Sequence, residues 1–468
     1  MTTAEHSPLT AVILAAGQGT RMKSARAKVL HELCGRPMVH FVVDAALAAG
    51  AADVVVVVGH GRDEVSAYLA RAFGERVRTA LQEQQRGTGD AVRCALPLLR
   101  PDADAVLLLC GDTPLLDAEE LGRLRDARGA LPLAMLTAVL PDATGYGRIL
   151  RDAGGSVVGV REHKDASAEE RAIREMNPAV YLARGAFLRE AIGALRADNA
   201  QGELYLTDVV AQAAAAGGVG ALVARDHGSL VGINDRAQLA AAEEVLHGRI
   251  ADRLRKAGAT IRAGARIDAG VEIEPDAVVE HGVVLRGSTR VGAGAKIDVG
   301  SVLTDVAVAP GAVVKPYTVA AQSTIGEGAQ IGPFSHLRPE SRIEADAHIG
   351  NFVETKKTVV RRGAKANHLA YLGDGDIGEG ANVGAGTIFC NYDGFKKHRT
   401  EIGPGAFIGS DSQIVAPVRV GAGAYVATGT TVTRDVPDEA LAIGRARQEN
   451  KEGYAGKLRA RLKAGTKG

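Results

Sequence analysis

A six-residue repeat of aliphatic side chains runs through the second half of the chain, from about residue 260 onward. Neither the 3.6-residue period of an α-helix nor the two-residue period of a strand requires this spacing. A hexapeptide β-helix does, because each flat face of a coil turns one aliphatic side chain inward and small residues occupy the corners. A Gly/Ala-rich disordered segment would not keep such a phase. The first block of expected inward positions is Ile261, Ile267, Ile273, Val279, Leu285, Val291, Ile297 and Leu303.

The phase of the repeat then slips, and each slip is followed by a new regular block. The second block is Val313, Val319, Ile325, Ile331, Leu337, Ile343 and Ile349. The third is Val353, Val359, Ile377, Val383 and Phe389, with Lys365 and Tyr371 at the two intervening sites. After a predicted loop at about 391–400, the repeat resumes at Ile402, Ile408, Ile414, Val420, Val426 and Val432.

Residues 9 to about 140 follow a different pattern, in which short β-branched runs alternate with helical segments. Near-continuous apolar strands separated by helices predict a mostly parallel, Rossmann-like sheet covered on both faces. Ligands in such sheets bind beyond the carboxyl ends of the strands, where "AAGQGT" and "GDTP" are expected. We therefore predict an α/β domain at 1–235, a linking helix at 236–258, a β-helix at 259–437 and a C-terminal tail at 438–468.

Composition narrows the class of protein. The formal net charge of +1 over 468 residues argues against a general nucleic-acid or membrane-surface protein. The four cysteines form no CxxC pair, which is typical of a reduced cytosolic protein without a disulfide framework or zinc site. No basic n-region precedes the first apolar run, and no apolar stretch reaches the roughly 20 residues that span a bilayer. A cytoplasmic protein is expected.

The segment "LAAGQGTRM" follows the first expected strand and has the composition of a phosphate-binding loop. It lacks the GK[ST] of a Walker A motif, and Met22 stands where GxGxxG would place its third glycine. Gly17 and Gly19 allow backbone N–H groups to approach a phosphate, and Arg21 and Lys28 could neutralise it.

Further motifs accompany this loop in a specific order: "LQEQQRGTGDA", "CGDTPL", "TGYGRI", "REHKDA" and "GIND". This set resembles the sugar-1-phosphate nucleotidyltransferases. The second half adds "LRPESRI", "GNFVETKK", "KANHLAYLGD", "GAGTIFCNYDG" and "GTTVTRDV". Together they resemble a bifunctional bacterial family that joins an N-acetylglucosamine-1-phosphate uridyltransferase to a glucosamine-1-phosphate acetyltransferase. The resemblance covers about residues 9–455.

The resemblance implies roles for residues of the first half. The "LAAG" backbone and Gln82 would recognise uracil, with Gly87 and Thr88 beside the nucleoside; the loop residues concerned are Leu14, Ala15, Ala16 and Gly17. Arg21 and Lys28 would act in catalysis by stabilising charge that moves onto pyrophosphate. Asp112 and Asn234 offer the hard oxygen ligands that Mg²⁺ prefers. The N-acetylglucosamine end would be bound by Gly147, Glu162 and Asn177, and Asn234 is also expected among the substrate-binding residues.

In the second half His368 is the expected general base for attack by the glucosamine amine, because histidine titrates near neutral pH. Glu354 could orient His368 or the amine. By resemblance, the sugar phosphate would be bound by Arg338, Lys356, Tyr371, Asn382 and Lys397. Acetyl-coenzyme A (acetyl-CoA) would be bound by Ala385, Asn391, Tyr392, Ser410, Thr428 and Arg445, with a backbone N–H near Ala385 as oxyanion donor.

Two residues depart from the family pattern. Asn367 precedes the proposed base where relatives often carry Gly or Pro, and Thr428 stands where many carry Ala. Cys110 and Cys390 are expected to be structural thiols.

The resemblance also implies a left-handed β-helix and a homotrimer whose acetyl-transfer sites form at subunit contacts. The expected reactions are acetylation of glucosamine-1-phosphate by acetyl-CoA, followed by uridylyl transfer from UTP, with Mg²⁺, to N-acetylglucosamine-1-phosphate. The product, UDP-N-acetylglucosamine, would feed peptidoglycan and, in organisms that make it, lipopolysaccharide. Two alternatives keep the same layout: a single-activity nucleotidyltransferase with a β-helix for oligomerisation, and a regulatory nucleotide-exchange subunit. The set Arg21, Lys28, Asp112 and His368 argues against the regulatory subunit. The segments "HLAYLGD" and "CNYDG" argue against the single-activity enzyme, so the bifunctional enzyme is favoured over both.

Overall fold

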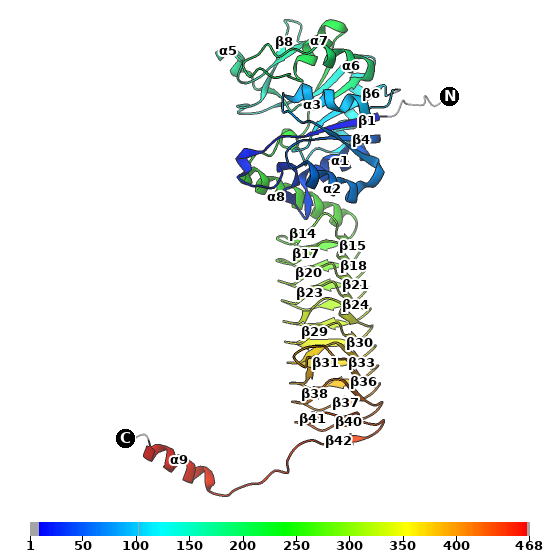
Figure 1. Cartoon of the computed structure of the whole chain (residues 1–468), viewed down its shortest axis with the longest axis vertical. Coiled ribbons are helices and arrows are strands. Elements are labelled where there is room, and N and C mark those ends of the chain that lie inside the picture. The colour runs from blue at the N-terminus through cyan, green and yellow to red at the C-terminus, as the bar shows by residue number, and fades with distance from the viewer. Residues whose placement is uncertain (1–8, 102, 466–468) are drawn as a thin grey trace, which may run out of the picture. The chain divides into compact units, whose positions relative to one another are not determined.

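The computed structural model describes residues 9–101 and 103–465, and the chain separates into two compact units that divide between Arg249 and Ile250. Helix α8 (Arg236–Lys256) crosses this division, where the sequence predicts a linking helix at 236–258. Figure 1 shows the α/β unit and the stacked coils. The inference of no signal peptide rests largely on residues 1–8, and the end of the tail comprises residues 466–468; both lie outside the described residues.

A ten-stranded mixed sheet forms the centre of the first unit in the described residues. Its order is β5-β4-β1-β6-β11-β7-β10-β8-β9, and β12 pairs with β7. The strand bounds are β1 Leu9–Ala15, β4 Ala51–Val58, β5 Val77–Leu81, β6 Ala105–Cys110, β7 Leu133–Val139, β8 Gly147–Arg151, β9 Val157–Arg161, β10 Glu175–Asn177, β11 Tyr181–Arg184 and β12 Val219–Val223.

The four strands β5-β4-β1-β6 are parallel, as the alternating pattern predicts, whereas β11, β10, β8 and β9 pair antiparallel with their neighbours. The carboxyl ends of β1, β4 and β6 therefore meet at one edge of the sheet. A small hairpin, β2 (Glu32–Leu33) and β3 (Arg36–Pro37), stands apart from this sheet.

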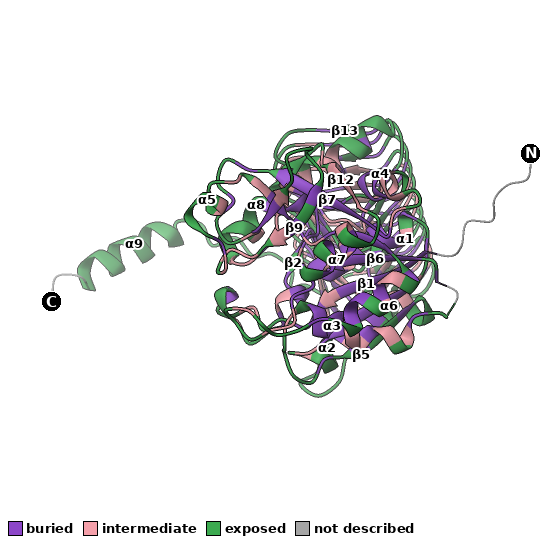
Figure 2. Cartoon of the chain, turned by 90° about the horizontal axis from the view of Figure 1, so that it is seen from above, coloured by how far each residue is buried: buried purple, intermediate pink, exposed green. Residues whose placement is uncertain are grey.

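Helices cover both faces of the sheet, because successive side chains of each strand point to opposite faces. Ile13 packs in a core with α1 and α4, and Val12 packs in a second core with α3, α6 and α7. Figure 2 shows β1, β6 and β7 as buried ribbons among these helices. The helix bounds are α1 Met38–Ala48, α2 Arg62–Phe73, α3 Thr88–Ala95, α4 Ala118–Arg128, α5 Ala168–Arg171, α6 Gly185–Gly193 and α7 Asp208–Ala216.

The second unit is a parallel β-helix made of three sheets, which is consistent with the left-handed type and confirms the predicted fold class. Its first sheet consists of β13 Thr260–Ile261, β16 Val278–Val279, β19 Lys296–Ile297, β22 Val313–Val314, β25 Gln330–Ile331, β28 His348–Asn351, β31 Lys365–His368, β34 Asn382–Val383, β37 Phe407–Ile408, β40 Tyr425–Val426 and β42 Leu441–Ala442.

The other two sheets complete each coil. The second sheet consists of β14 Arg266–Ile267, β17 Val284–Arg286, β20 Val302–Thr304, β23 Val319–Ala321, β26 His336–Leu337, β29 Glu354–Lys356, β32 Tyr371–Gly373, β35 Ile388–Cys390, β38 Gln413–Val415 and β41 Thr431–Val432. The third consists of β15 Glu272–Ile273, β18 Arg290–Val291, β21 Ala307–Val308, β24 Thr324–Ile325, β27 Arg342–Ile343, β30 Val359–Val360, β33 Gly375–Ile377, β36 Thr400–Ile402 and β39 Val418–Val420.

Six expected inward positions are wrong by one or two residues. The inward residues are Val314, Ala320, Thr355, Val360, Ala366 and Leu372, rather than Val313, Val319, Val353, Val359, Lys365 and Tyr371. The reason is local: four connections from the second sheet to the third have a five-residue step between inward positions, as from Leu303 to Val308. Val353 is buried nonetheless, at a corner. Lys365 and Tyr371 point outward, and so become available for binding.

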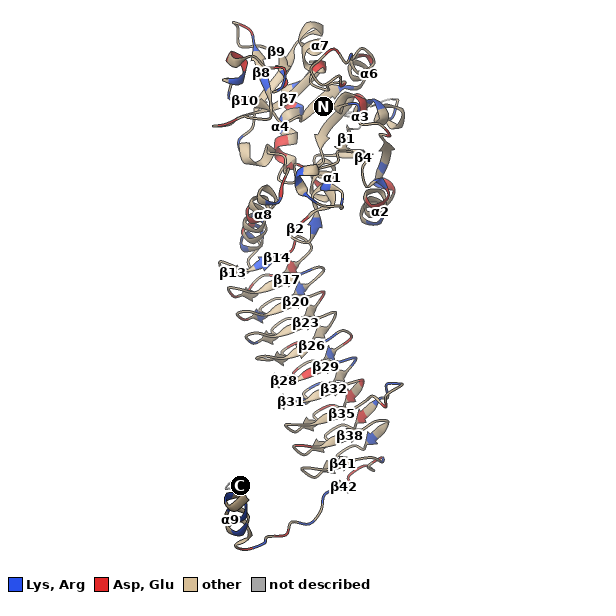
Figure 3. Cartoon of the chain, turned by 60° about the vertical axis from the view of Figure 1, so that its left-hand side comes forward, with Lys and Arg blue, Asp and Glu red and all other residues tan. Residues whose placement is uncertain are grey.

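Two irregular segments stand out from the coils. The predicted loop at about 391–400 connects β35 to β36 and lengthens the same corner that is shortened in earlier coils. Helix α9 (Tyr454–Gly465) near the C-terminus is exposed along its whole length, and its charged side chains are all basic (Figure 3). None of the helices in the described ranges is long and apolar enough to span a membrane.

Candidate active sites

The glycine loop lies at the carboxyl edge of the parallel strands. It leaves β1 beside Gly111, whose N–H donates to Leu14 O at 2.9 Å. Gly19 has φ +65°, a left-handed conformation that L side chains rarely adopt, and a Cβ there would lie 2.5 Å from Lys28 Cβ. A Cβ on Gly17 would have no atom within 4 Å. The loop therefore closes onto Lys28 at Gly19 and leaves open space at Gly17.

Two cavities of about 330 Å³ each meet below this loop and share Thr88, Cys110 and Asp112 as lining residues. We call them the loop cavity and the Glu162 cavity. The loop cavity contains the predicted residues Leu14, Ala15, Ala16, Gly17, Lys28, Gln82, Gly87, Thr88 and Asp112. The Glu162 cavity contains Arg21, Thr88, Asp112, Gly147, Glu162, Asn177 and Asn234. All the site residues that the sequence predicts in the first half thus line one joined space.

Lys28 lies where the loop cavity meets the Glu162 cavity. Its Nζ lies 2.5 Å from Asp112 Oδ2 and 2.8 Å from Asn234 Oδ1, and the Lys28 side chain is only 12% exposed. A carboxylate and an amide oxygen therefore converge on one positive charge. This donor set fits Mg²⁺, which takes hard oxygen ligands and completes its shell with water and phosphate oxygens.

Gln82 has a fixed orientation in the loop cavity. Its Nε2 donates to Gly87 O and to Asp90 Oδ2, both at 3.1 Å. Because both partners are acceptors, the amide nitrogen must face them, which leaves Gln82 Oε1 as an acceptor for a ligand. Gly87 has φ +107°, and a Cβ there would lie 2.6 Å from Leu204 O, so this position requires glycine.

The Glu162 cavity presents polar groups held by neighbours. Glu162 Oε1 accepts a hydrogen bond from Thr207 Oγ1 at 3.0 Å, and burial raises the pKa of the Glu162 carboxyl. Asn177 Nδ2 donates to Tyr181 OH at 2.7 Å, and its Oδ1 accepts from Ala179 N at 3.1 Å. These bonds hold the carboxylate and the amide in defined directions for a polyhydroxylated ligand.

Cys110 lines both cavities, yet its thiol is poorly suited to be a nucleophile. Burial, with a smaller contribution from Asp112, raises the pKa of Cys110 to about 12. The thiol is therefore protonated near neutral pH, whereas a nucleophilic cysteine needs its thiolate.

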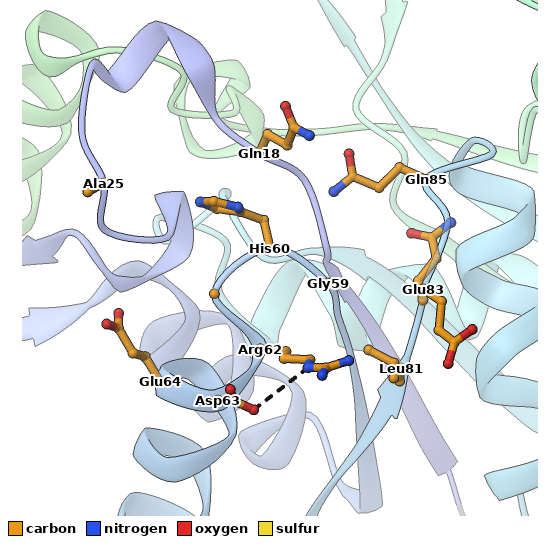
Figure 4. A pocket seen from close by; sticks show the side chains of 12 residues that line it. Gln18, Ala25, Gly59, His60, Arg62, Asp63, Glu64, Leu81, Glu83 and Gln85 are labelled. Carbon is orange, nitrogen blue, oxygen red and sulfur yellow. Dashed lines mark ion pairs between the residues drawn. The ribbon is translucent and has the colours of Figure 1, made fainter.

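A larger cavity of about 650 Å³ lies next to the loop cavity and shares Gln82 and Gln85 with it. Figure 4 shows Gln18, His60 and Gln85 around this space. Its charged lining consists of Arg62, Asp63, Glu64 and Glu83, so carboxylates outnumber the guanidinium. The loop cavity also carries two carboxylates, Asp112 and Glu203, but its Lys28 ammonium is largely buried beside the glycine loop. Arg62 is instead half-exposed and paired with Asp63, so we take the loop cavity as the better anion site despite its smaller volume.

Sequence reasoning missed several residues of the joined space. Gln85 Nε2 donates to Ala16 O at 2.6 Å and so holds the glycine loop. Its place in "QEQQRGTG", three residues after Gln82, is a signal that could have found it. Thr207 and Tyr146 also line the Glu162 cavity. Tyr146 stands in the "TGYGRI" segment, which could have indicated it, whereas Thr207 lies in a segment that carries no comparable pattern.

In the β-helix one predicted group gathers on the outer face of the second sheet. Arg338 Nη1 lies 2.8 Å from Glu354 Oε1, so the Glu354 carboxylate contacts Arg338. Glu354 stands opposite Tyr371 in the strand register, and Lys356 stands opposite Gly373. The neighbouring Lys397 ammonium lowers the pKa of Lys356. Two adjacent cations beside a guanidinium make a surface for a phosphate.

The loop 391–400 packs beside this group. Asn391 Nδ2 donates to Asp374 Oδ2 at 2.6 Å, and Tyr392 pairs with Lys397 across the loop. Asp393 accepts hydrogen bonds from the N–H groups of Phe395 and Lys396 at 2.8 and 2.7 Å. The loop is therefore ordered by its own side chains.

A second predicted group stacks along the corner between the first and second sheets. Backbone bonds run from Gly386 N to Leu369 O, from Asp411 N to Ala385 O and from Gly429 N to Ser410 O. Arg445 Nη1 donates to Thr428 O, so Thr428 acts through its main chain in this contact. The corner therefore aligns five predicted residues in successive coils: His368, Ala385, Ser410, Thr428 and Arg445.

The structure does not bring every predicted acetyl-transfer residue together within one chain. His368 ends β31 at the corner where the first sheet meets the second, whereas Lys356 and Lys397 lie at the opposite edge of the second sheet. Asn382 begins β34, opposite Lys365 rather than His368. The Cys390 Sγ contacts Gln413 Oε1 at 3.8 Å.

Comparison with known proteins agrees with both halves of this architecture. Residues 11–215 match the family model of MobA-like NTP transferase domains, and residues 399–434 match the model of the bacterial transferase hexapeptide, six repeats. A protein of Sorangium cellulosum named "Bifunctional protein GlmU" is 79% identical over 467 residues, which is 98% of this chain and 99% of that protein. The chain belongs to the GlmU family.

More distant members of the family also match nearly the whole chain. GlmU of Anaeromyxobacter is 53% identical over 97% of this chain and 94% of its own length, and GlmU of Trichlorobacter lovleyi is 49% identical over 96% and 98%. The resemblance seen in the motifs is therefore confirmed, and so is the prediction of a bifunctional enzyme with nucleotidyltransferase and acyltransferase parts. The single-activity and regulatory alternatives are not favoured. A GlmU of this kind acts on small molecules.

Proposed function

We propose that the first unit transfers the uridylyl group of UTP to N-acetylglucosamine-1-phosphate. We further propose that the β-helix unit acetylates glucosamine-1-phosphate with acetyl-CoA. The observation that carries the first activity is the convergence of Lys28, Asp112 and Asn234 between the loop cavity and the Glu162 cavity. Lys28 would bind an anion, and Asp112 with Asn234 would bind a cation. Both sites would lie between the loop cavity, proposed for the base, and the Glu162 cavity, proposed for the sugar.

The loop cavity suits uracil. Gln82 Oε1 can accept a hydrogen bond from N3–H of uracil, whereas N3 of cytosine is itself an acceptor and would be repelled. The backbone of Leu14–Gly17 and the residues Gly87 and Thr88 line the same cavity and would enclose the nucleoside.

The sugar would bind in the Glu162 cavity. Glu162 would accept hydrogen bonds from sugar hydroxyls, Asn177 would contact the N-acetyl end, and the Gly147 backbone would lie beside the ring. A Cβ on Gly147 would lie 2.8 Å from Val160 Cγ1, so a larger residue would crowd this wall.

Transfer would proceed by direct displacement. An oxygen of the sugar phosphate attacks the α-phosphorus of UTP, and the bond from that phosphorus to the pyrophosphate oxygen breaks. Lys28 and Arg21 would stabilise the negative charge that develops on pyrophosphate. Asp112 and Asn234 would hold Mg²⁺, which when bound supplies further charge neutralisation.

Acetyl transfer would use His368 as general base. The amine nitrogen of glucosamine-1-phosphate attacks the thioester carbonyl carbon, and His368 takes a proton from that nitrogen. The carbon–sulfur bond then breaks and the leaving sulfur takes up this proton, so coenzyme A leaves as the thiol. Arg338, Lys356, Tyr371, Asn382 and Lys397 would bind the sugar phosphate. The coenzyme would lie against Ala385, Asn391, Tyr392, Ser410, Thr428 and Arg445, with a backbone N–H near Ala385 facing the carbonyl oxygen.

We propose a homotrimer in which neighbouring chains complete each acetyl-transfer site. Support comes from the separation of His368 and the Lys356–Lys397 pair at opposite edges of the second sheet within one chain. A second chain packed against the β-helix could bring such groups together.

The two reactions in sequence would yield UDP-N-acetylglucosamine for peptidoglycan and, in organisms that make it, lipopolysaccharide. We place them in the cytoplasm, where UTP and acetyl-CoA are found. The domain limits that we propose are 1–235, 236–258, 259–437 and 438–468.

Two assays on the full-length protein test this proposal: free-thiol release for acetyl transfer and pyrophosphate release for uridylyl transfer. His368→Ala should abolish the first and preserve the second. Persistence of both reactions would refute His368 as the base. Loss of both would show that His368 is structural or that the units are coupled. Wild-type protein that lacks either reaction would overturn the proposal itself.

A further inference from the structure

Three residues of different ligand types meet away from the three cavities described in the first unit. Cys34 occupies the turn of the β2–β3 hairpin, and Glu243 and His247 lie on α8. One potential ligand atom from each residue lies within 4.8 Å of the other two. We propose that Cys34, Glu243 and His247 bind a structural Zn²⁺ ion, a site that goes beyond the two proposed reactions. The cysteine spacing predicts no zinc site, because two of these three ligands come from a helix more than 200 residues along the chain.

The positions of the three side chains are well defined. Glu243 and His247 are four residues apart, so they lie on the same face of α8. Cys34 is buried, and its N–H donates to Glu243 Oε1 at 2.9 Å. Both turn residues of the hairpin, Cys34 and Gly35, have positive φ, as a type I′ turn needs. The hairpin therefore presents its cysteine to one helix face.

His247 provides the observation that points to a ligand. Its Nδ1 is buried and has no hydrogen-bond partner among the residues that the structure describes. A buried ring nitrogen without a partner is unfavourable, and most such groups in proteins are satisfied. A bound cation together with its water would provide partners for the ring that the described side chains do not.

The donor set selects the class of metal. A thiolate, an imidazole and a carboxylate suit Zn²⁺ and other late divalent metals, whereas Mg²⁺ and Ca²⁺ prefer oxygen alone. Tetrahedral Zn²⁺ places its ligand atoms about 3.3–3.8 Å apart, so side-chain rotations that bring the three together would suffice. Water would supply the fourth ligand, since Glu243 and His247 are only partly buried.

The location of the cluster indicates a structural role for the ion near Lys28 and Asn234. Cys34 follows Lys28 by six residues, and α8 begins two residues after Asn234. A metal ion at the cluster would therefore join the same two segments whose ends meet in the Lys28–Asn234 hydrogen bond. It would act by holding these segments together and would not touch substrate.

Cobalt provides the test, because Co²⁺ replaces Zn²⁺ and reports a thiolate ligand by absorption. Full-length protein is freed of metal with a chelator and titrated with Co²⁺ in excess Mg²⁺, which occupies sites made of oxygen ligands. We expect a near-ultraviolet sulfur-to-cobalt charge-transfer band and tetrahedral visible bands that saturate at one Co²⁺ per chain. Zn²⁺ should abolish both bands and raise the melting temperature with its concentration.

Variants assign the site. Cys34→Ser and His247→Gln should each lose the charge-transfer band or weaken Co²⁺ binding at least tenfold, while their circular dichroism stays that of the wild type. Cys110→Ser should keep the band, which excludes a thiolate from the joined cavities. Absence of the band in wild type, or its survival in Cys34→Ser, would overturn the proposal. The proposal would also be overturned by loss of the band in Cys110→Ser, or by a His247→Gln variant whose band and Co²⁺ affinity both equal those of the wild type.

Discussion

The Lys28 Nζ lies 2.5 Å from Asp112 Oδ2, although 84 residues separate the two in the chain. The same Nζ lies 2.8 Å from Asn234 Oδ1. The ammonium thus occupies the space between two oxygen ligands that would hold Mg²⁺. Lys28 must therefore move toward phosphate when the metal and the nucleotide bind, and the two roles proposed for this space compete for the same position.

Lys28→Met should separate these roles. Uridylyl transfer should fall on the order of 10²- to 10³-fold, because a charge that stabilises the leaving pyrophosphate is lost. Mg²⁺ should bind the nucleotide-free variant more tightly than wild type, because Asp112 has lost its cationic partner. Pyrophosphate release and Mg²⁺ calorimetry measure the two effects. Lys23→Met, at an exposed position in the same segment, should change neither. Equal Mg²⁺ affinity in wild type and Lys28→Met would contradict the competition.

Gln82→Leu should reduce the preference for UTP over CTP. The wild-type amide must present Oε1 to the base, since its nitrogen is engaged by Gly87 and Asp90. A leucine of similar size removes this acceptor, so the ratio of kcat/KM for UTP over CTP should drop on the order of 10²-fold. Gln84→Leu is the control, because Gln84 is an exposed neighbour. A preference retained in Gln82→Leu would rule out this recognition.

Gly19→Ala should displace the Lys28 side chain while leaving its ammonium group chemically unchanged. The new methyl group would lie 2.5 Å from Lys28 Cβ, and φ +65° adds backbone strain. Uridylyl transfer should fall on the order of 10²-fold through misplacement of the ammonium, with acetyl transfer unchanged. The control is Gly122→Ala, because Gly122 lies in the middle of α4 and has open space around it. Wild-type uridylyl transfer in Gly19→Ala would show that the loop position is tolerant.

The repeat in the sequence predicted the β-helix because one aliphatic residue per flat face is a geometric requirement. It misplaced Val313 and Val319 because each stands beside another small apolar residue, Val314 or Ala320, that fits the inward position equally well. When a corner is one residue shorter, the inward position moves from one apolar residue of such a pair to the other, so the sequence pattern does not change. Only the stacking of complete coils decides which residue of the pair points inward.

The candidate site of the first unit was accessible to sequence reasoning for a related reason. Its residues follow strand ends in short motifs, and parallel strands bring their carboxyl ends to one edge. The pairing of Lys28 with Asn234 was not accessible, because it joins segments 206 residues apart through a long-range fold. Thr207 was missed because its role depends only on where the start of α7 meets Glu162.

Asp393→Ala should open the loop 391–400. The wild-type carboxylate accepts two backbone N–H bonds and contacts His398 Nε2 at 2.6 Å, and these bonds lower the pKa of Asp393. Because the pKa of Asp393 is lower in the folded loop than in the unfolded chain, its carboxylate stabilises the loop fully at pH values above the unfolded-state pKa. This stabilisation is lost as the pH falls through the folded-state pKa. The KM for the acetyl-transfer sugar phosphate should rise, because Lys397 is no longer held near Lys356. Uridylyl transfer should not change, and a wild-type KM would show that the loop is not needed for binding.

Glu162→Gln should make the protein more stable and a poorer enzyme at neutral pH. Burial raises the pKa of Glu162 above its ordinary value of 4.5, so the folded state holds a proton that the unfolded chain releases in that window. The free energy of unfolding therefore falls as pH rises from 4.5 through the folded pKa, and the penalty persists above it. Glutamine does not titrate, so the melting temperature of the variant should exceed that of wild type near pH 7, and the gap should close well below 4.5. The KM for N-acetylglucosamine-1-phosphate should rise about tenfold, because a charged acceptor is lost.

The control variant Glu169→Gln should change stability in the opposite direction and lower the melting temperature near pH 7, because the Ser167 hydroxyl lowers the pKa of Glu169. A stability gap for Glu162→Gln that does not vary with pH would exclude the buried carboxylate as its cause.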